Sequence, residues 1–282
     1  MTLVTDYGPG SDFVGSLHAV IYRIAPGTRV IDFDHRIPPG DVTLGALRLE
    51  RMTRYVPPGV HVGIVDPGVG SRRLPVALAT SERIFVGPDN GLLCWAAEAC
   101  GGVSAAVVLD DERYVLQGRS TTFDGRDLFA PAAAHLAGGA DITEIGSAIE
   151  PERLVSIERP RAIVDENGRS AVLEVTQVDG FGNVQLSGDA STARRLGLEP
   201  GVVVSTRTWT APHTGAGEAP AASGAAFSAT FATSFSDVGT GALVLLVDSD
   251  GALGLSANRG RADALLGIVP WTTVRIERAG PA

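Results

Sequence analysis

Lysine is the most informative absence from this sequence of 282 residues, because all 23 residues counted as Lys or Arg are arginine. Chemistry that depends on a lysine amine is therefore excluded. This removes Schiff-base enzymes, pyridoxal phosphate enzymes, P-loop proteins and protein kinases. Any positive charge at a functional site must come from arginine, from a helix N-terminus or from a metal ion.

Cysteine is also scarce, since only Cys94 and Cys100 are present, six residues apart in one predicted helix and therefore on different faces. We expect neither a disulfide nor a zinc site, and this usage fits the reducing cytoplasm. No apolar run is long enough to span a bilayer, and strand-like residues follow Met1 directly in place of a signal peptide. We therefore expect a cytoplasmic protein with no membrane partner.

Basic residues are outnumbered by acidic ones, and the formal net charge is -9. This balance argues against a nucleic-acid partner, which would need a basic surface. Hydrophobic residues make up 44% and charged residues 20% of the chain, as is typical of folded proteins. The length suits one large domain or two medium ones.

Residues up to about 150 alternate between apolar, β-branched runs and segments with helical spacing. Predicted strands cover 3–5, 29–32, 59–65, 76–79, 84–87 and 103–109. Predicted helices cover 13–24, 42–55, 92–99 and 128–136. In the first helix we expect Ser11 or Asp12 as the cap. The residues expected on its buried face are Phe13, Val14, Leu17, Ile21 and Ile24. The alternation predicts an α/β layered domain with a largely parallel sheet.

Helical spacing stops near residues 151–160, and short strand patterns follow at 161–164, 170–178, 202–206, 242–247 and 273–276. Residues 165–168 have the composition of a hairpin turn. We predict an N-terminal α/β domain over 1–155 and a smaller C-terminal antiparallel β-barrel domain over 161–282. The Ala/Gly/Ser-rich stretch 213–230 is predicted to be an exposed, mobile loop.

Four aspartates, Asp6, Asp34, Asp66 and Asp89, lie in loops at the ends of predicted strands. In open α/β sheets, ligands bind at the carboxyl ends of the strands, so these loops are candidate site loops. The stretch that begins at Gly59 is the clearest, because a buried strand ends in Asp66-Pro67-Gly68 and an arginine follows soon after. Each loop taken alone is equally compatible with an ordinary turn.

In the β domain, residues 179–183 form a Gly-flanked turn that contains Asp179, Phe181 and Asn183. An aromatic face and an amide suit a flat heteroaromatic ring, although a plain β-turn with a core phenylalanine is the alternative. Residues 249–251 and 256–260 are weaker signals and are typical of turns when considered separately.

Six segments taken together resemble the S-adenosyl-L-methionine (SAM) hydroxide adenosyltransferases, or SAM hydrolases, which are related to the fluorinases and chlorinases. The segments are Thr5–Gly8, Val65–Gly70, Pro88–Gly91, Thr122–Asp127, Phe181–Asn183 and Asn258–Gly260. The resemblance spans nearly the whole chain in the right order. It implies an N-terminal α/β domain, a C-terminal β-barrel, and a homotrimer with active sites between the N domain of one subunit and the C domain of the next.

The resemblance also implies a reaction in which water or hydroxide attacks ribose C5′ and gives adenosine and L-methionine, with SAM as substrate and no cofactor. Asp66 and Arg73 match the first two members of the family's Asp-Arg-His triad. Asp124 stands where the third member, histidine, is expected, and Asp6 matches the aspartate that binds the ribose diol. The other residues that the resemblance assigns to substrate binding are Phe123, Gly125, Asp179, Phe181, Asn183, Ser249 and Ala257.

Asp124 in place of histidine predicts two carboxylates beside one arginine. Like charges this close favour a shared proton, so that one of the two carboxylates could serve as a base near neutral pH. The replacement also leaves open a protein that binds the nucleoside without turning it over.

Two further alternatives come from other classes. A halogenase is disfavoured because halogenases carry tyrosine at the position of Asp66, and fluorinases have a longer insertion after the region of Arg73. A metal-dependent hydrolase would need an acidic cluster, for which the available residues are Asp6, Asp32, Asp34, Asp66 and Asp89. We favour hydrolysis without a metal.

Overall fold

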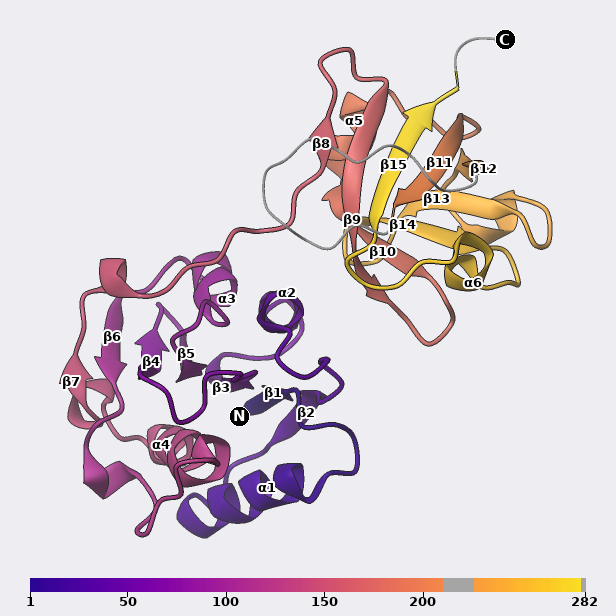
Figure 1. Ribbon diagram of the computed structural model, residues 1–282. Helices are drawn as coiled ribbons and strands as arrows, with labels where there is room; N and C mark the ends of the chain where they lie inside the picture. Colours follow the sequence, from indigo (N-terminus) through magenta and orange to yellow (C-terminus); the bar gives the residue numbers. More distant parts are fainter. Residues whose placement is uncertain (210–225, 280–282) are drawn as a thin grey trace. The chain divides into compact units, whose positions relative to one another are not determined.

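The computed structural model describes residues 1–209 and 226–279. The chain divides into two compact units, Met1–Glu158 and Arg159–Ala282, which we describe separately (Figure 1). None of the helices within the described residues has the length and apolar character needed to cross a membrane.

The first unit is built on one seven-stranded sheet with the order β2-β1-β3-β5-β4-β6-β7. Its strands are β1 Thr2–Thr5, β2 Ile31–Asp34, β3 Gly59–Ile64, β4 Pro75–Ala79, β5 Arg83–Pro88, β6 Ala105–Val108 and β7 Ser147–Ala148. The β2-β1-β3-β5 half is parallel, and the remaining strands pair antiparallel. The predicted α/β layered domain is therefore confirmed, with its parallel strands at the centre and along one edge.

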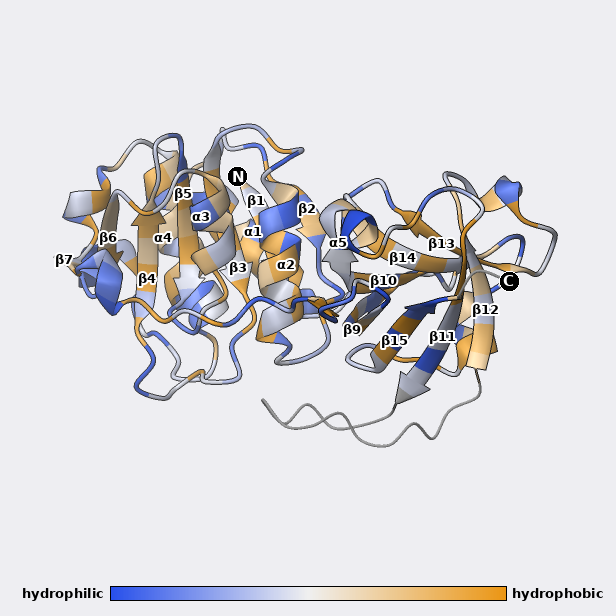
Figure 2. Ribbon diagram, turned by 90° about the horizontal axis from the view of Figure 1, so that it is seen from above, coloured by the Kyte–Doolittle hydropathy of each residue, from blue (hydrophilic) through white to orange (hydrophobic). Residues whose placement is uncertain are grey.

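Helices cover both faces of this sheet, with α1 and α4 on one side and α2 and α3 on the other (Figure 1). Their bounds are α1 Asp12–Ile24, α2 Val42–Met52, α3 Cys94–Ala99 and α4 Ala130–Ala137. A π-helix, Gly125–Phe129, leads directly into α4, and short 3₁₀ turns lie at Glu112–Tyr114, Ile142–Glu144 and Pro151–Arg153. Hydrophobic residues run along β4 and β5 between the two helix layers (Figure 2).

The predicted capping of α1 is confirmed, because the Ser11 hydroxyl accepts a hydrogen bond from the Phe13 N–H at 3.1 Å. Leu17 and Ile21 are buried as expected. Phe13 is not part of that buried face, since 46% of it is exposed. It instead contacts the rings of Tyr7 and Phe123 at the carboxyl edge of the sheet. The periodicity of a single helix cannot predict such contacts with other segments.

Most predicted boundaries in this unit shift by only a few residues, and the shift in β2 is the one that matters. This strand covers Ile31–Asp34, so Asp34 is its last residue and does not lie in the following loop. Pairing with β1 determines the extent of β2, and a short local pattern cannot indicate that pairing.

The second unit is a seven-stranded barrel, which closes where β10 pairs with β9, and β8 extends β9 outside it. Its strands are β8 Ile163–Val164, β9 Ser170–Val178, β10 Val184–Asp189, β11 Val203–Trp209, β12 Ala226–Phe231, β13 Leu243–Val247, β14 Ala252–Ala257 and β15 Thr273–Arg278, and its helical segments are α5 Ala190–Arg195, a 3₁₀ turn Phe235–Asp237 and α6 Ala262–Leu266. The predicted barrel and the hairpin turn at 165–168 are confirmed.

Three details of the predicted barrel are corrected. The β12–β13 pair is parallel, so the barrel is not wholly antiparallel. Residues 226–230 of the predicted mobile loop belong to β12, and the rest of that predicted loop, 213–225, lies outside the described residues. The strands β10, β12 and β14 were not predicted. The sequences of β12 and β14 are rich in Ala, Ser and Gly, whose strand propensity is low, and β10 ends in Gly188 and Asp189, which are depleted in strands.

A buried histidine joins the sheet to the end of α2. His61 in β3 is 1% exposed, and its Nε2 lies 3.0 Å from Nη1 of Arg83. The Arg83 guanidinium also donates to the carbonyl oxygens of Thr53 and Val56 at the end of α2. Burial, aided by the charge of Arg83, lowers the pKa of His61 to about 3, so the ring accepts this hydrogen bond in its neutral form.

This histidine predicts how stability depends on pH. Its pKa is about 3 in the folded protein and about 6.5 when unfolded, so between these values the unfolded state binds the extra proton. The contribution of neutral His61 to the free energy of unfolding should be fully present above pH 6.5. As the pH decreases below 6.5, the free energy of unfolding should decrease by at most about 1.4 kcal/mol per pH unit because of this group. Urea unfolding of wild type and His61→Gln, which keeps an acceptor for Arg83, measures the contribution. Equal slopes between pH 7.5 and 5 in the two proteins would contradict it.

Candidate active site

The parallel strands β1 and β3 bring two of the predicted aspartates to one edge of the sheet. Asp6 follows β1 directly, and its N–H donates to the carbonyl of Ile64 at the end of β3 at 3.2 Å. Asp66 follows β3 two residues later. The Gly40 N–H donates to Oδ2 of Asp6 at 2.9 Å. Burial raises the pKa of Asp6 and the charge of Asp66 adds to this, although the hydrogen bond from Gly40 opposes the shift.

Arg73 reaches back to Asp66 because the chain turns sharply between them. Backbone hydrogen bonds from Val69 to Asp66 and from Ser71 to Gly68 close the turn. Nε of Arg73 donates to both carboxylate oxygens of Asp66 at 3.0 Å, and Nη2 also contacts Oδ2. The predicted pair of charges at the end of the central strand is therefore present in the folded protein.

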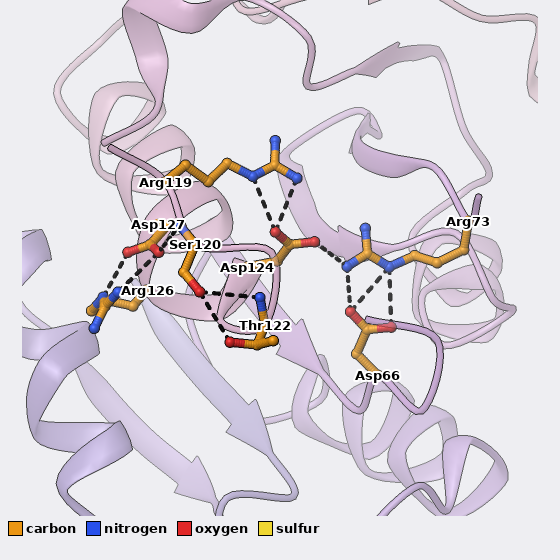
Figure 3. Close-up of polar contacts among 8 residues, drawn as sticks. All are labelled: Asp66, Arg73, Arg119, Ser120, Thr122, Asp124, Arg126 and Asp127. Atoms are coloured by element: carbon orange, nitrogen blue, oxygen red, sulfur yellow. Dashed lines mark hydrogen bonds and ion pairs between the residues drawn. The ribbon is translucent and has the colours of Figure 1, made fainter. Parts of the chain in front are cut away.

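The same guanidinium binds a second carboxylate. Nη2 of Arg73 donates to Oδ2 of Asp124, so Arg73 joins two acidic side chains (Figure 3). The exposed fractions of the side chains are only 10% for Arg73, 7% for Asp66 and 3% for Asp124. Burial alone would lower the pKa of Arg73, but the hydrogen bonds to the two carboxylates outweigh it and raise the pKa. Arg73 is a permanent cation.

A second arginine, Arg119, completes this group. Its Nε and Nη2 lie 3.1 Å and 2.9 Å from Oδ1 of Asp124 (Figure 3). The four side chains Asp66, Arg73, Asp124 and Arg119 thus form a row of alternating charge, which we call the charge row. The expectation of two carboxylates beside a single arginine is wrong. The carboxylates are joined through the Arg73 cation, and Arg119 adds a second positive charge beside Asp124.

The π-helix Gly125–Phe129 positions Asp124, which immediately precedes it. Asp127 within this helix is 2% exposed and pairs with Arg126 at 2.6 Å. It also accepts the N–H of Ser120 at 2.8 Å, which anchors the segment carrying Arg119 (Figure 3). π-Helical turns inside α-helices are frequent at functional sites, where the extra residue changes the direction of the side chains.

Three aromatic rings meet beside the carboxylates. The ring centroid of Tyr7 lies 5.5 Å from that of Phe13 and 5.8 Å from that of Phe123. The Tyr7 hydroxyl packs so closely against Gly125 that a Cβ there would lie 2.0 Å from its oxygen. Burial, followed by the charges of Asp6 and other nearby carboxylates, raises the pKa of Tyr7. The Tyr7 hydroxyl is therefore protonated and able to donate a hydrogen bond.

The charge row borders a cavity of about 450 Å³. Arg73, Arg119 and Asp124 line it together with Thr121 and Asp111. The volume is in the range of small-molecule pockets. A small polar molecule, such as water, can reach the buried carboxylate of Asp124 from this side.

The acidic cluster considered for a metal-dependent hydrolase does not form. Asp32 pairs with His18 at 2.9 Å, Asp34 pairs with Arg48 at 3.1 Å, and Asp89 accepts a backbone N–H at 2.9 Å. In residues 1–209 and 226–279, no three His, Cys, Asp or Glu side chains gather in a way that could hold a metal ion. The positions of these carboxylates therefore disfavour that alternative.

In the barrel unit, the carboxylate of Asp179 organises the loop that follows β9. Oδ1 accepts the N–H groups of Phe181 and Asn183 at 2.8 Å and 2.9 Å, and Oδ2 accepts the Asn183 amide at 2.8 Å. Phe181 at the tip is 80% exposed. The polar groups of this loop hold its shape, so the part that it presents outward is the aromatic ring.

The remaining two predicted residues lie at opposite ends of β14. Val184 pairs with Leu255, so Ala257 lies at the same end as the 179–183 loop. Ser249 precedes the other end of the strand, and a six-residue strand is about 17 Å long or more. The fold thus groups Ala257 with the loop and places Ser249 apart from both.

Comparison with known proteins decides the family. The model of the SAM hydroxide adenosyltransferase N-terminal domain matches residues 1–146, and that of the C-terminal domain matches residues 173–275. This chain belongs to the SAM hydroxide adenosyltransferase family. The resemblance found in the sequence is therefore confirmed.

Individual proteins and a solved structure are similar to this chain as well. A protein from Salinispora tropica named (R)-S-adenosyl-L-methionine hydrolase is 42% identical over 282 residues, covering 98% of this chain and 97% of that protein. A fluorinase from Actinoplanes sp. is 26% identical over 65% of this chain and 70% of its own. A crystal structure of an uncharacterized conserved protein from Thermotoga maritima superposes with a TM-score of 0.86 at 31% identity, covering 98% and 99% of the two chains.

Two residues of the site in this family member were not predicted, Tyr7 and Arg119. The sequence held a signal for Arg119. Asp124 in place of histidine adds a negative charge, and in a chain without lysine a nearby arginine is a suitable side chain to balance it. Tyr7 had no such signal, because its neighbour across the sheet edge, Gly125, is more than a hundred residues away in the chain.

The contact between Tyr7 and Gly125 predicts a specific packing defect. Gly125→Ala should place a methyl group against the Tyr7 hydroxyl and lower the free energy of unfolding by about 1–3 kcal/mol. Tyr7→Phe in the same chain should restore part of the loss, because it removes the clashing oxygen. Urea unfolding measures both variants. Gly180→Ala, which meets nothing within 4 Å, is the control, and an equal loss there would contradict the assignment.

Proposed function

We propose that this chain hydrolyses S-adenosyl-L-methionine, with water or hydroxide displacing L-methionine from ribose C5′ to give adenosine. The observation that carries the proposal is the buried Asp66–Arg73 pair at the end of the central strand, in a chain that is 42% identical over nearly its full length to a named SAM hydrolase. The substrate is a small molecule, and no separate cofactor takes part.

Breaking the C5′–S bond requires little assistance from the protein. An O–C5′ bond forms while the C5′–S bond breaks, and its electron pair leaves on sulfur as a neutral thioether. The positive charge of the sulfonium disappears, so departure needs no acid. The protein must hold a water molecule in line with the C5′–S bond and partly remove its solvent.

We assign the orientation of that water to Asp66. A carboxylate that accepts a hydrogen bond from the water aligns it and takes up its proton as the new bond forms. Arg73 holds both oxygens of Asp66 at 3.0 Å and so determines the direction of the free lone pairs. Asp124 holds Arg73 from the other side. These three residues are the proposed catalytic set.

Substrate binding is assigned to both units. In the first, Asp6 accepts the ribose hydroxyls, and Phe123 beside Gly125 supplies an apolar wall. Aromatic faces also attract a cation, which suits a sulfonium more than its neutral product. In the barrel unit the proposed residues are Asp179, Phe181, Asn183, Ser249 and Ala257. Within that set the exposed Phe181 ring is the direct contact, and Asp179 acts by holding the loop.

The first prediction of this proposal concerns products. Incubation with S-adenosylmethionine should give adenosine and methionine in equal amounts, and added chloride or fluoride should leave the products unchanged. The physical reason is that Asp66, an anion, repels a halide nucleophile at the position where it would attack. Chromatography with mass detection measures the products, with and without a chelator. Formation of 5′-chloro- or 5′-fluoro-adenosine would contradict the proposal.

A protein that only binds the nucleoside is the second candidate, and Asp124 in place of histidine is the feature that favours it. The same assay separates the two, when run with enzyme in excess over substrate. Adenosine after a single turnover supports hydrolysis, whereas intact S-adenosylmethionine recovered from the complex supports binding alone.

The second prediction concerns Asp6. Removing its carboxylate in Asp6→Ala should weaken adenosine binding by about 2–4 kcal/mol, because a charge-assisted contact to the ribose diol is lost. Calorimetry with adenosine, the product, measures affinity without turnover. Asp12→Ala, which removes an exposed carboxylate from the same region, should bind normally. Unchanged affinity in Asp6→Ala would mean that Asp6 only holds the turn at Gly40.

The third prediction concerns assembly and location. We infer a homotrimer, as the family resemblance implies, because the proposed binding residues are divided between two compact units and neither set is complete alone. We also propose a cytoplasmic location, which the scarcity of cysteine favours. Sedimentation equilibrium should give the mass of three chains, and activity should fall on dilution below the dissociation constant of the assembly. A monomer that retains full activity would contradict the inference.

A further inference from the structure

We infer that Arg119 is a positioning residue of the active site, which acts through Asp124 and Arg73 on the direction of Asp66. The inference rests on the proposed function and extends it to a residue outside the proposed catalytic set. It starts from the balance of charge in the charge row. Asp66 and Asp124 are both nearly excluded from water, and Arg73 by itself supplies one positive charge for two negative ones.

An uncompensated carboxylate at 3% exposure is strongly unfavourable, because burial removes the water that would stabilise it. Arg119 supplies the second charge. Its Nε and Nη2 both point to Oδ1 of Asp124, while Oδ2 of the same carboxylate faces Arg73 (Figure 3). Each oxygen of Asp124 therefore has its own guanidinium.

The division of these contacts matters for Asp66. Nη2 of Arg73 contacts both Asp66 and Asp124, so the two carboxylates compete for one donor group. Without Arg119, Asp124 would draw more strongly on Arg73 and pull it away from Asp66. Arg119 thereby keeps Arg73 aligned with Asp66, and Asp66 aligned with the water that it is proposed to orient.

The geometry also separates Arg119 from an ordinary surface ion pair. Its side chain is 41% exposed and borders the 450 Å³ cavity, but the carboxylate that it pairs with is buried. The backbone next to it is held, because Asp127 accepts the N–H of Ser120 at 2.8 Å. Arg113 offers the contrast, since it pairs with Asp111 at 2.7 Å while 73% exposed. Exposed pairs of that kind contribute little.

The test is a double-mutant cycle on turnover of S-adenosylmethionine. Arg119→Met should lower kcat roughly 10-fold or more and change KM less than about 3-fold, because the effect falls on the alignment of Asp66. The acid limb of its pH–rate profile should move to higher pH, since an uncompensated carboxylate is protonated more easily. In the Asp124→Asn background, where no charge needs balancing, the same replacement should change kcat less than about 2-fold.

Two control variants test whether the effect is specific to the charge of Arg119. Arg113→Met removes the same charge from an exposed pair and should leave kcat and the pH profile unchanged. Arg119→Lys should restore part of kcat, because a cation without the planar fork still balances the charge. Equal losses from Arg119→Met in the wild-type and Asp124→Asn backgrounds, or an unshifted pH profile, would overturn the inference. If Arg119→Met does not fold, Arg119→Gln, which keeps donors without the charge, takes its place.

A second measurement distinguishes failure of this inference from failure of the proposed function. Urea unfolding of wild type, the two single variants and the double variant gives the coupling between residues 119 and 124 without any substrate. If wild type forms no adenosine, the proposed function is wrong, and the unfolding cycle then decides the pairing alone. Coupling between the two positions supports it, and independent, additive effects overturn it.

Discussion

The contact of the Arg73 guanidinium with two buried carboxylates is the interaction on which the site depends. A planar guanidinium has donors on several edges and can hold Asp66 and Asp124 at the same time, whereas a lysine ammonium would act as one point charge. The chain contains no lysine, so this role could fall only to arginine. The turn after β3 and the π-helix before α4 both direct their carboxylates to this one group.

The polar groups of the candidate site have different roles in the two units. At the edge of the α/β sheet, buried charges balance one another, which leaves a row of groups with defined directions and little freedom to move. In the barrel, Asp179 satisfies the backbone of its own loop and leaves Phe181 outward. The first arrangement suits orienting a small polar reactant, and the second suits contact with an aromatic ring.

Local pattern predicted the architecture well where each element carries its own signal. The apolar run of β3 and the cap at Ser11 are examples, because burial and capping are decided within a few residues. Local pattern failed to predict strands whose formation depends on pairing with neighbouring strands. The strands β12 and β14 contain small residues that form strands only when neighbouring strands supply their hydrogen bonds, and the parallel β12–β13 pair depends on the path of the whole barrel.

By itself the sequence determined the candidate pair Asp66 and Arg73, since a strand, a tight turn and an arginine lie within one local segment. It also determined that Asp124 brings a second carboxylate. Arg119, five residues before Asp124, was within reach of a local reading, but only the tertiary structure decided that it pairs with that buried carboxylate. Tyr7 reaches Gly125 from a distant segment, because packing acts through space and not along the chain.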